Sequence, residues 1–424
     1  MPPRLRTRRA RRRYVVRVVL AVFAAIALLV GAAVGLVAWS GLPHYDDVAA
    51  PTLTLPNDAA SLDRGRKLVG LACRRCHAAA DGGPLRGRAL AELPPRLGRV
   101  NAANLTRDAN AGIAGWDDGA LARLMRTGID RDGRFVPPYM PRYTRMASDD
   151  LGAVLAFLRS DHPWTAPDAT RVPASAPSLW VKLHALYDWH PPHLPQEQIP
   201  VPSRDDPVAL GRYLVEDVLL CNDCHGSGPD AIALEHPTDD PGYLGGGMAL
   251  RDRNGEALYA ANITFDEQHG IGTWDFDAFR RAVVDGFGPD GALVRWPMPR
   301  LGELDDVEVA AIFAYLASAP HVARAVPESA DYKVPGPRLD PGRHVFFRAG
   351  CHYCHGREPA ELRSWAAVVI VRYPDDEALA RFVADPSRAR ADAQMPGFAA
   401  VLSEADRLAV AAHVRSLAEG AARK

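Results

Sequence analysis

The 424-residue sequence lacks several features that mark large classes of protein. It has no surplus of basic residues, because 50 Lys and Arg stand against 51 Asp and Glu, which excludes a basic nucleic-acid-binding body. It lacks a second long hydrophobic run, so no more than one membrane span is expected. Hydrophobic residues make up 48%, which excludes a disordered or fibrous chain. The length indicates two or three domains.

The near-zero net charge hides an uneven distribution. Residues 1–40 contain eight arginines and no acidic residue, so the remaining 42 basic residues face 51 acidic ones, a formal charge of −9. The arginines precede Val18–Trp39, which carries no charge and exceeds the ~20 apolar residues needed to cross a bilayer. Because arginines stay cytoplasmic, we expect a basic cytoplasmic tip, a single transmembrane helix in the inner membrane, and a periplasmic body.

A cleaved signal peptide is the competing interpretation of this segment. Signal peptides have hydrophobic regions of ~7–15 residues, and this run is longer, although Ala38-Trp39-Ser40 resembles a weak cleavage site. The length therefore favours an uncleaved anchor.

The six cysteines all lie in three Cys-x-x-Cys-His pentapeptides, which is the signature for covalent attachment of c-type haem. On a helical turn, residues three apart share a face, so both thiols can reach the two vinyl groups of one haem. The histidine that follows then presents its imidazole to the iron. The predicted attachment pairs with their proximal ligands are Cys73, Cys76 and His77; Cys221, Cys224 and His225; and Cys351, Cys354 and His355.

Other uses of paired cysteines account less well for this pattern. Structural zinc needs four ligands, usually two pairs, and a thioredoxin-like motif needs a β-α-β context. Disulfides would not explain a histidine after every pair. Three covalently bound haem c groups are the prediction.

Apart from the initiator Met1, three methionines are followed by proline, and one follows each haem motif: Met140, Met298 and Met395. Proline lacks a backbone donor and has a fixed φ, so Met-Pro indicates a rigid loop, and such a loop can hold a thioether over the open face of a haem. We expect these three sulfurs to be the distal iron ligands. The remaining internal methionines are expected in the core, and His352, inside the third motif, is expected in solvent. Those core methionines are Met125, Met146 and Met248.

The haem motifs belong to a longer internal repeat. A Gly-Arg pair precedes each motif at a predicted helix start, with Asp63, Asp205/Asp206 or Asp340/Pro341 supplying the cap. An amphipathic helix is predicted after each Met-Pro, and the glycine is expected where the first helix crosses this last one. The predicted last helices are Asp149–Leu158, Asp305–Leu316 and Ser403–Leu417.

The first two repeats are closely related. Asn104-Leu105-Thr106-Arg107-Asp108 recurs at Asn262-Ile263-Thr264-Phe265-Asp266, and Gly112-Ile113-Ala114-Gly115-Trp116-Asp117 recurs at Gly270-Ile271-Gly272-Thr273-Trp274-Asp275, always 158 residues later. The haem motifs are only 148 apart, so about ten extra residues are expected around Gly242–Leu250.

On these motifs, residues 58–420 resemble class I cytochrome c domains. More narrowly, they are similar to the three-haem cytochrome subunits of membrane-bound dehydrogenases for alcohols, gluconate, other sugars or N-heterocycles. The resemblance implies an all-α fold and the axial pairs His77/Met140, His225/Met298 and His355/Met395. The family usually attaches through its carboxyl-terminal region, whereas the candidate anchor here is amino-terminal.

The expected organisation is three cytochrome c domains in tandem after a transmembrane helix. The expected ranges are 1–17 (basic tip), 18–39 (transmembrane helix), 57–161 (domain 1), 162–207 (Pro-rich linker), 208–320 (domain 2), 321–339 (linker) and 340–420 (domain 3). Within the first linker, Leu179–Trp189 is unusually apolar. Either it covers a groove between domains, or it is a patch for a partner or a membrane interface.

The expected function is electron transfer as the subunit of a dehydrogenase, with a quinone or an oxidase as acceptor. The alternative is a free-standing anchored carrier between a respiratory complex and a terminal oxidase or reductase. A haem enzyme such as a peroxidase needs an open distal position, which three methionine ligands would close. No bond chemistry of its own is therefore expected for the chain, nor any nucleic-acid partner.

Overall fold

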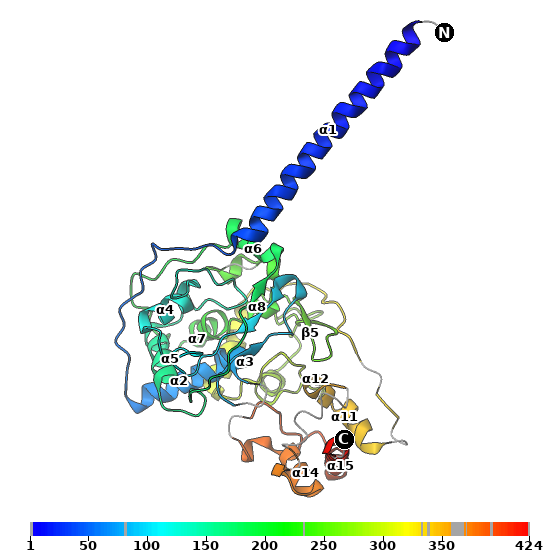
Figure 1. Cartoon of the computed structure of the whole chain (residues 1–424). Helices are drawn as coiled ribbons and strands as arrows, with labels where there is room; N and C mark the ends of the chain where they lie inside the picture. Colours follow the sequence, from blue (N-terminus) through cyan, green and yellow to red (C-terminus); the bar gives the residue numbers. More distant parts are fainter. Residues whose placement is uncertain are drawn as a thin grey trace.

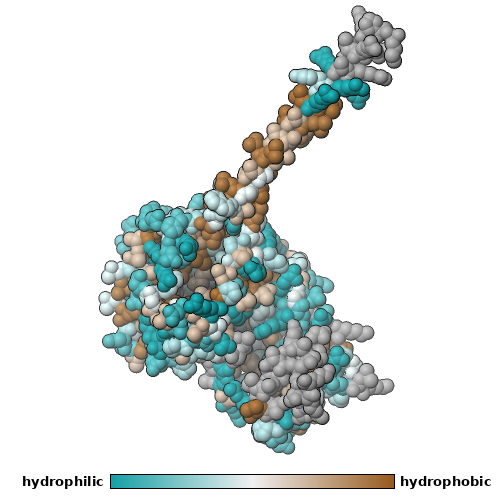
Figure 2. Space-filling view, in the orientation of Figure 1, coloured by the Kyte–Doolittle hydropathy of each residue, from teal (hydrophilic) through white to brown (hydrophobic). Residues whose placement is uncertain are grey.

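The computed structural model describes residues 3–79, 83–231, 234–331, 334–336, 340–357, 369, 371–390 and 393–422. The predicted tip, second linker and third domain each include residues outside this set. The chain begins with one long helix, α1 (Pro3–Ser40), which projects from a helical body (Figure 1). Within Arg11–Ser40 of α1, the most apolar 18-residue stretch has a mean hydropathy of 2.8 and buries no side chain. Figure 2 shows this helix as a largely hydrophobic rod on a mostly hydrophilic body.

The body contains three helical repeats and short, two-stranded antiparallel sheets. The all-α expectation is confirmed, since the strands are only two or three residues long. The first repeat contains α2 (Ala59–Ala72), α3 (Arg74–His77), β1 (Arg88–Ala89), η1 (Pro95–Leu97), β2 (Gly98–Arg99), β3 (Asn101–Ala102), α4 (Asp118–Thr127) and α5 (Ser148–Arg159). The linker adds β4 (Ala176–Pro177), paired with β2, and α6 (Leu179–Tyr187).

The second repeat follows the same order, with π-helical turns at η2 and η5. It contains α7 (Pro207–Tyr213), η2 (Leu214–Val218), α8 (Asn222–His225), η3 (Pro229–Ala231), η4 (Pro237–Asp239), β5 (Ala249–Arg251), β6 (Ala257–Tyr259), α9 (Phe276–Arg280), η5 (Arg281–Asp285) and α10 (Asp306–Ser318). The third contains α11 (Pro341–Arg348), α12 (Cys351–His355), α14 (Asp376–Ala384), η6 (Pro386–Arg388) and α15 (Glu404–Ala422).

In every repeat, the first helix crosses the last one at a glycine. A Cβ added to Gly65 would lie 2.0 Å from the carbonyl oxygen of Ala153. A Cβ added to Gly211 would lie 1.9 Å from the carbonyl oxygen of Ala311, and one added to Gly342 would lie 2.1 Å from that of Ala409. Only glycine permits such an approach of two backbones. The predicted crossing of first and last helices is confirmed.

The helix caps were predicted in two of the three cases. Asp206 caps α7 and Asp340 caps α11, each accepting from the amide three residues later. The expectation for Asp63 is wrong, because α2 begins earlier and Asp58 caps it by accepting from the Ser61 amide. Asp63 lies inside α2, where it pairs with Arg66 at 3.2 Å.

The first two repeats share one hydrophobic core. It includes Leu68 and Leu155 from the first repeat and Leu214 and Leu316 from the second, all essentially inaccessible. The third repeat has its own core around Phe346 and Val410, which Phe287 of the second repeat also joins. The first two repeats therefore form one packed unit, and the third is attached to it.

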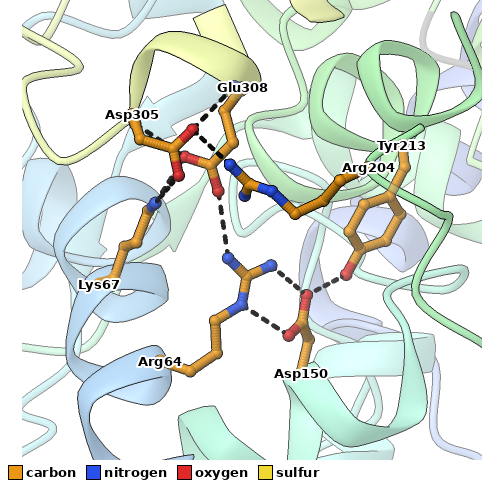
Figure 3. Close-up of polar contacts among 7 residues, drawn as sticks. All are labelled: Arg64, Lys67, Asp150, Arg204, Tyr213, Asp305 and Glu308. Atoms are coloured by element: carbon orange, nitrogen blue, oxygen red, sulfur yellow. Dashed lines mark hydrogen bonds and ion pairs between the residues drawn. The ribbon is translucent and has the colours of Figure 1, made fainter. Parts of the chain in front are cut away.

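A buried polar network crosses the interface of this unit (Figure 3). Arg64 of α2 makes a bidentate pair with Asp150 of α5, at 2.8 and 2.7 Å, and reaches Glu308 of α10 at 3.3 Å. Lys67 donates to Glu308 at 2.5 Å, while Tyr213 of α7 donates to Asp150 at 2.5 Å. The first helix of each repeat therefore contacts an acidic residue at the start of the other repeat's last helix: α2 contacts Glu308 of α10, and α7 contacts Asp150 of α5. Two related units that pack in a self-complementary way are expected to make such reciprocal contacts.

Candidate functional site

The three Cys-x-x-Cys-His motifs lie on short helices, α3, α8 and α12, directly after the first helix of each repeat. In the first, the amides of Cys76 and His77 bond the Cys73 carbonyl at 3.2 and 3.0 Å, which closes one turn. The second motif has the same turn, at 3.2 and 2.8 Å, around the carbonyl of Cys221. None of the six cysteines, all of which lie in the described part of the chain, forms a disulfide. Burial raises the pKa of Cys73, Cys221 and Cys351 to about 12.

Backbone carbonyls orient the first two motif histidines. His77 Nδ1 lies 2.7 Å from the carbonyl oxygen of Ala103, and His225 Nδ1 lies 2.7 Å from that of Ala261. A carbonyl accepts only from a protonated nitrogen, so the bond fixes the tautomer and leaves Nε2 as the free donor atom for a metal. Burial lowers the pKa of both histidines, and it lowers the pKa of His355 to about 4. All three therefore favour the neutral form that can ligate iron.

Two glycines hold the chain behind these histidines. The amide of Gly87 donates to the His77 carbonyl at 2.8 Å, and that of Gly246 donates to the His225 carbonyl at 2.6 Å. Both have a positive φ, at 78° and 71°, and a Cβ would collide with the backbone near Ala103 or Ala261. The matched roles show that the second repeat's extra residues precede Gly246, within 226–245, which corrects the expected range of 242–250.

The methionines separate as predicted. Met125, Met146 and Met248 are buried, with 7%, 0% and 5% of their surface exposed. Met140, Met298 and Met395 are partly buried and lie in non-helical loops, next to the cores that Cys73, Cys221 and Cys351 also border. The predicted loop conformation of Met-Pro is confirmed. The structure also places each methionine beside the same core as its motif.

The repeated Asn-x-Thr-x-Asp segment fastens the chain that follows each of the first two repeats. Asn104 accepts from both the amide and the hydroxyl of Thr106 and donates to the carbonyls of Asp168 and Thr170, at 2.8 and 3.0 Å. Asn262 repeats this with Thr264 and donates to the carbonyls of Val322 and Arg324, at 2.7 and 3.3 Å. These side chains are buried, and their hydrogen bonds hold the chain that follows against each repeat.

The next repeated block starts a helix. Ile113 and Ile271 are both buried, at 4% exposure, and Asp117 and Asp275 cap α4 and α9. Each aspartate accepts from the amide three residues on, at 2.7 Å.

The predicted exposure of His352 is wrong. This side chain is 1% exposed and stacks on Phe347, with ring centroids 4.8 Å apart. Tyr353 packs beside it, with centroids 4.0 Å apart. A helical-wheel position alone did not reveal that aromatic neighbours cover this face of α12.

Sequence reasoning also missed three arginines. Arg75 of the first motif donates to the sulfur of Cys224 in the second, at 3.8 Å, so these two motifs are in contact. Arg142 is buried and donates to the carbonyls of Val136 and Met140. Arg300 donates to the Met395 carbonyl at 2.8 Å. The triplet Met-Pro-Arg, repeated 158 residues apart, was the available signal for the last two.

These residues fit a covalently bound haem at each site. Two thiols and an imidazole lie on one turn, and a thioether lies in a loop beside the core that the first cysteine also borders. Within the described residues, no group of three or more His, Cys, Asp or Glu forms a site for a bare metal ion. The cysteines, histidine and methionine of each repeat suit the iron of a haem, which brings its own ring of nitrogen ligands.

No family model matches the chain. A nicotinate dehydrogenase subunit from Pseudomonas putida is 29% identical over 349 residues, covering 78% of this chain and 28% of the relative. The cytochrome c subunit of alcohol dehydrogenase (quinone) from Gluconacetobacter polyoxogenes is 28% identical, covering 62% and 57%. The fructose dehydrogenase cytochrome subunit of Gluconobacter japonicus is 27% identical, covering 68% and 59%.

The match thus spans less than two thirds of the length of these relatives. The all-α body with its cysteine motifs is similar, over more than half of the chain, to cytochrome subunits of dehydrogenases.

Proposed function

We propose that the chain is a membrane-anchored three-haem c-type cytochrome that transfers electrons on the periplasmic side, as the electron-transfer subunit of a membrane-associated dehydrogenase. The observation that carries the proposal is a combination found three times: two thiols and an imidazole in one helical motif, and a thioether in a later loop that borders the same core as the first cysteine. A bound haem iron cycles between its ferrous and ferric states and supplies the redox chemistry.

The chain's own residues bind and orient the three groups. The attachment pairs are Cys73/Cys76, Cys221/Cys224 and Cys351/Cys354, and the axial pairs are His77/Met140, His225/Met298 and His355/Met395. If these histidines and methionines hold each iron, no position would be left for a substrate, so this ligand set supports electron transfer without bond chemistry.

Contacts between the sites support an order in which the second site lies in the middle. Arg75 joins the first motif to Cys224 of the second. On the other side, Arg295, in the loop that carries Met298, lies over the Tyr353 ring at 4.3 Å, and Arg300 bonds the Met395 carbonyl. The second repeat therefore contacts the first through its attachment motif and the third through its methionine loop.

The dehydrogenase partner is proposed from the relatives, which are themselves subunits of dehydrogenases. Mild solubilisation of membranes, followed by affinity purification of this chain, tests it. A dehydrogenase subunit should co-purify in a fixed ratio, and deletion of the gene should abolish oxidation of one class of substrate. A general slowing of respiration without a co-purifying dehydrogenase would favour the free-standing carrier instead.

The distal ligands are tested by Met140→Ala, Met298→Ala and Met395→Ala. Methionine raises the reduction potential relative to other ligands, so each variant should lower one of three potentials by a sizeable part of the ~0.8 V range that axial ligands span. Potentiometric titration with optical detection measures all three. A variant that leaves every potential unchanged would remove that methionine from the ligand set.

A further inference from the structure

Helix α6 lies at the foot of α1, where the long apolar helix enters the body (Figure 1). The two helices are in contact, and Lys182 of α6 donates to the carbonyl of Ala38 near the end of α1. The apolar run Val18–Trp39 ends at this level. At ~1.5 Å per residue the run spans about the ~30 Å of a hydrocarbon core. If α1 crosses the bilayer, α6 is therefore at the depth of the headgroups.

The two faces of α6 have different surroundings. Val181 and Ala185 are buried, together with Trp189 just beyond the helix, in a small core that Cys76 of the first haem site borders. This packing fixes α6 to the first repeat. The interpretation of Leu179–Trp189 as a covering helix therefore applies to only one face of α6.

The other face carries Leu179, Leu183 and Tyr187, which are 36%, 37% and 69% exposed. Their spacing of four residues places them in one stripe along the helix. The neighbouring end of α1 is also apolar and exposed, since Leu36 is 61% and Trp39 is 85% exposed. Trp and Tyr are the residues enriched at membrane–water interfaces, and a lysine beside them can keep its charged end in water.

We infer that α6 is a second membrane contact, lying in the periplasmic headgroup region with Leu179, Leu183 and Tyr187 toward the acyl chains. The occupant of this stripe is the lipid of the bilayer that α1 crosses, because α6 contacts the end of the apolar run of α1 and both helices expose apolar side chains there. The inference rests on the proposed anchoring by α1. It places the first haem site next to the membrane, whereas the third repeat lies at the opposite end of the body from α1 (Figure 1).

Photocrosslinking of the full-length holoprotein in phosphatidylethanolamine/phosphatidylglycerol vesicles tests this. The benzophenone amino acid p-benzoylphenylalanine replaces one exposed residue at a time, which adds no cysteine. The three positions are Leu183 in α6, Leu28 in α1 as the anchor control, and Val307 in α10 as the exposed control away from α6, with exposures of 37%, 75% and 44%. After irradiation, mass spectrometry counts phospholipid adducts.

Leu28 and Leu183 should both yield at least tenfold more lipid adduct than Val307. If Leu28 labels and Leu183 matches Val307, α6 does not touch lipid and the inference is overturned while the anchor stands. If Leu183 crosslinks to protein in place of lipid, the stripe has a protein occupant, and the inference is again overturned. If neither Leu28 nor Leu183 labels, the proposed anchoring itself fails.

Discussion

At the residue scale, two equivalent arginines of the related repeats make different contacts. Arg142 and Arg300 each follow a Met-Pro pair. Arg142 turns back to the carbonyls of Val136 and Met140 and thus stabilises its own loop. Arg300 reaches the carbonyls of Met395 and Ala393 in the third repeat, at 2.8 and 3.3 Å. Arg300 therefore holds the loop that carries Met395, the distal ligand proposed for the third site.

Arg300→Ala should loosen the Met395 loop and lower the potential of the third site, with the second site little changed. Arg300→Lys keeps the charge but cannot reproduce the planar set of donors, so it should rescue only in part. Arg142→Ala, the matched change, should act on the first site. Redox titration of the three variants separates these outcomes, and a shift confined to the second site in Arg300→Ala would contradict the assignment.

Helix crossings are the feature that recurs at the element scale. The glycine of each first helix faces the backbone of the last helix, and the Cβ of Phe157, Tyr315 or His413 lies within 2.8 Å of the added Cβ position. A helix pair this close has no room for a methyl group. The crossing therefore sets how the motif helix, which follows the first helix directly, is held against the core.

Gly65→Ala should separate α2 from α5 and destabilise the body by roughly 1–3 kcal/mol, because overpacking forces the backbones apart. Gly152→Ala is the control on α5, since its nearest contact is a side-chain atom of Pro56 at 3.4 Å. It should be neutral or stabilise by up to ~1 kcal/mol through helix propensity. Denaturant unfolding followed by circular dichroism compares them, and equal stabilities would refute the close-packing argument.

The third crossing carries a titratable group. His413 of α15 occupies the position that Phe157 and Tyr315 hold in the other crossings, and its side chain is 9% exposed and lies 2.9 Å from Asp340. Burial lowers its pKa below the ordinary value, although Asp340 acts in the opposite direction and Arg343 in the same one. The folded third repeat therefore favours the neutral imidazole.

Since the unfolded chain binds this proton more readily than the folded one, stability should fall as the pH drops below ~6.5, the ordinary histidine pKa, toward the lower folded value. His413→Tyr, which copies Tyr315, should remove that component. Hydrogen exchange of the α11 and α15 amides at pH 7.5 and 5.5 measures the effect. Identical pH dependence in the variant and the parent would rule out His413 as its source.

Two packed bodies make up the molecule at the largest scale. The first and second repeats share a core and the network of Figure 3, whereas the third has its own core. Glu308 is central to the shared interface, because it is 2% exposed and contacts both Arg64 and Lys67. Removal of one partner from a buried ionic network leaves the others uncompensated.

Glu308→Ala should therefore destabilise the unit of the first two repeats by ~3–5 kcal/mol. Glu303→Ala, which removes a more exposed partner of Arg66, should cost ~0–1 kcal/mol. Calorimetry of the full chain would show the first change in the transition of the two-repeat unit, with the third repeat's transition unmoved. A small effect from both variants would show that hydrophobic burial alone joins the repeats.

The sequence by itself determined the Cys-x-x-Cys-His motifs, the methionine loops, the helix crossings and the apolar amino-terminal helix. These depend on local spacing and periodicity, which a single segment displays. Tertiary structure decided that two repeats share a core, that Arg300 holds the third site's loop, that His352 is buried and that α6 meets α1. Each of these depends on surfaces brought together from distant parts of the chain, and no local pattern records which surfaces will meet.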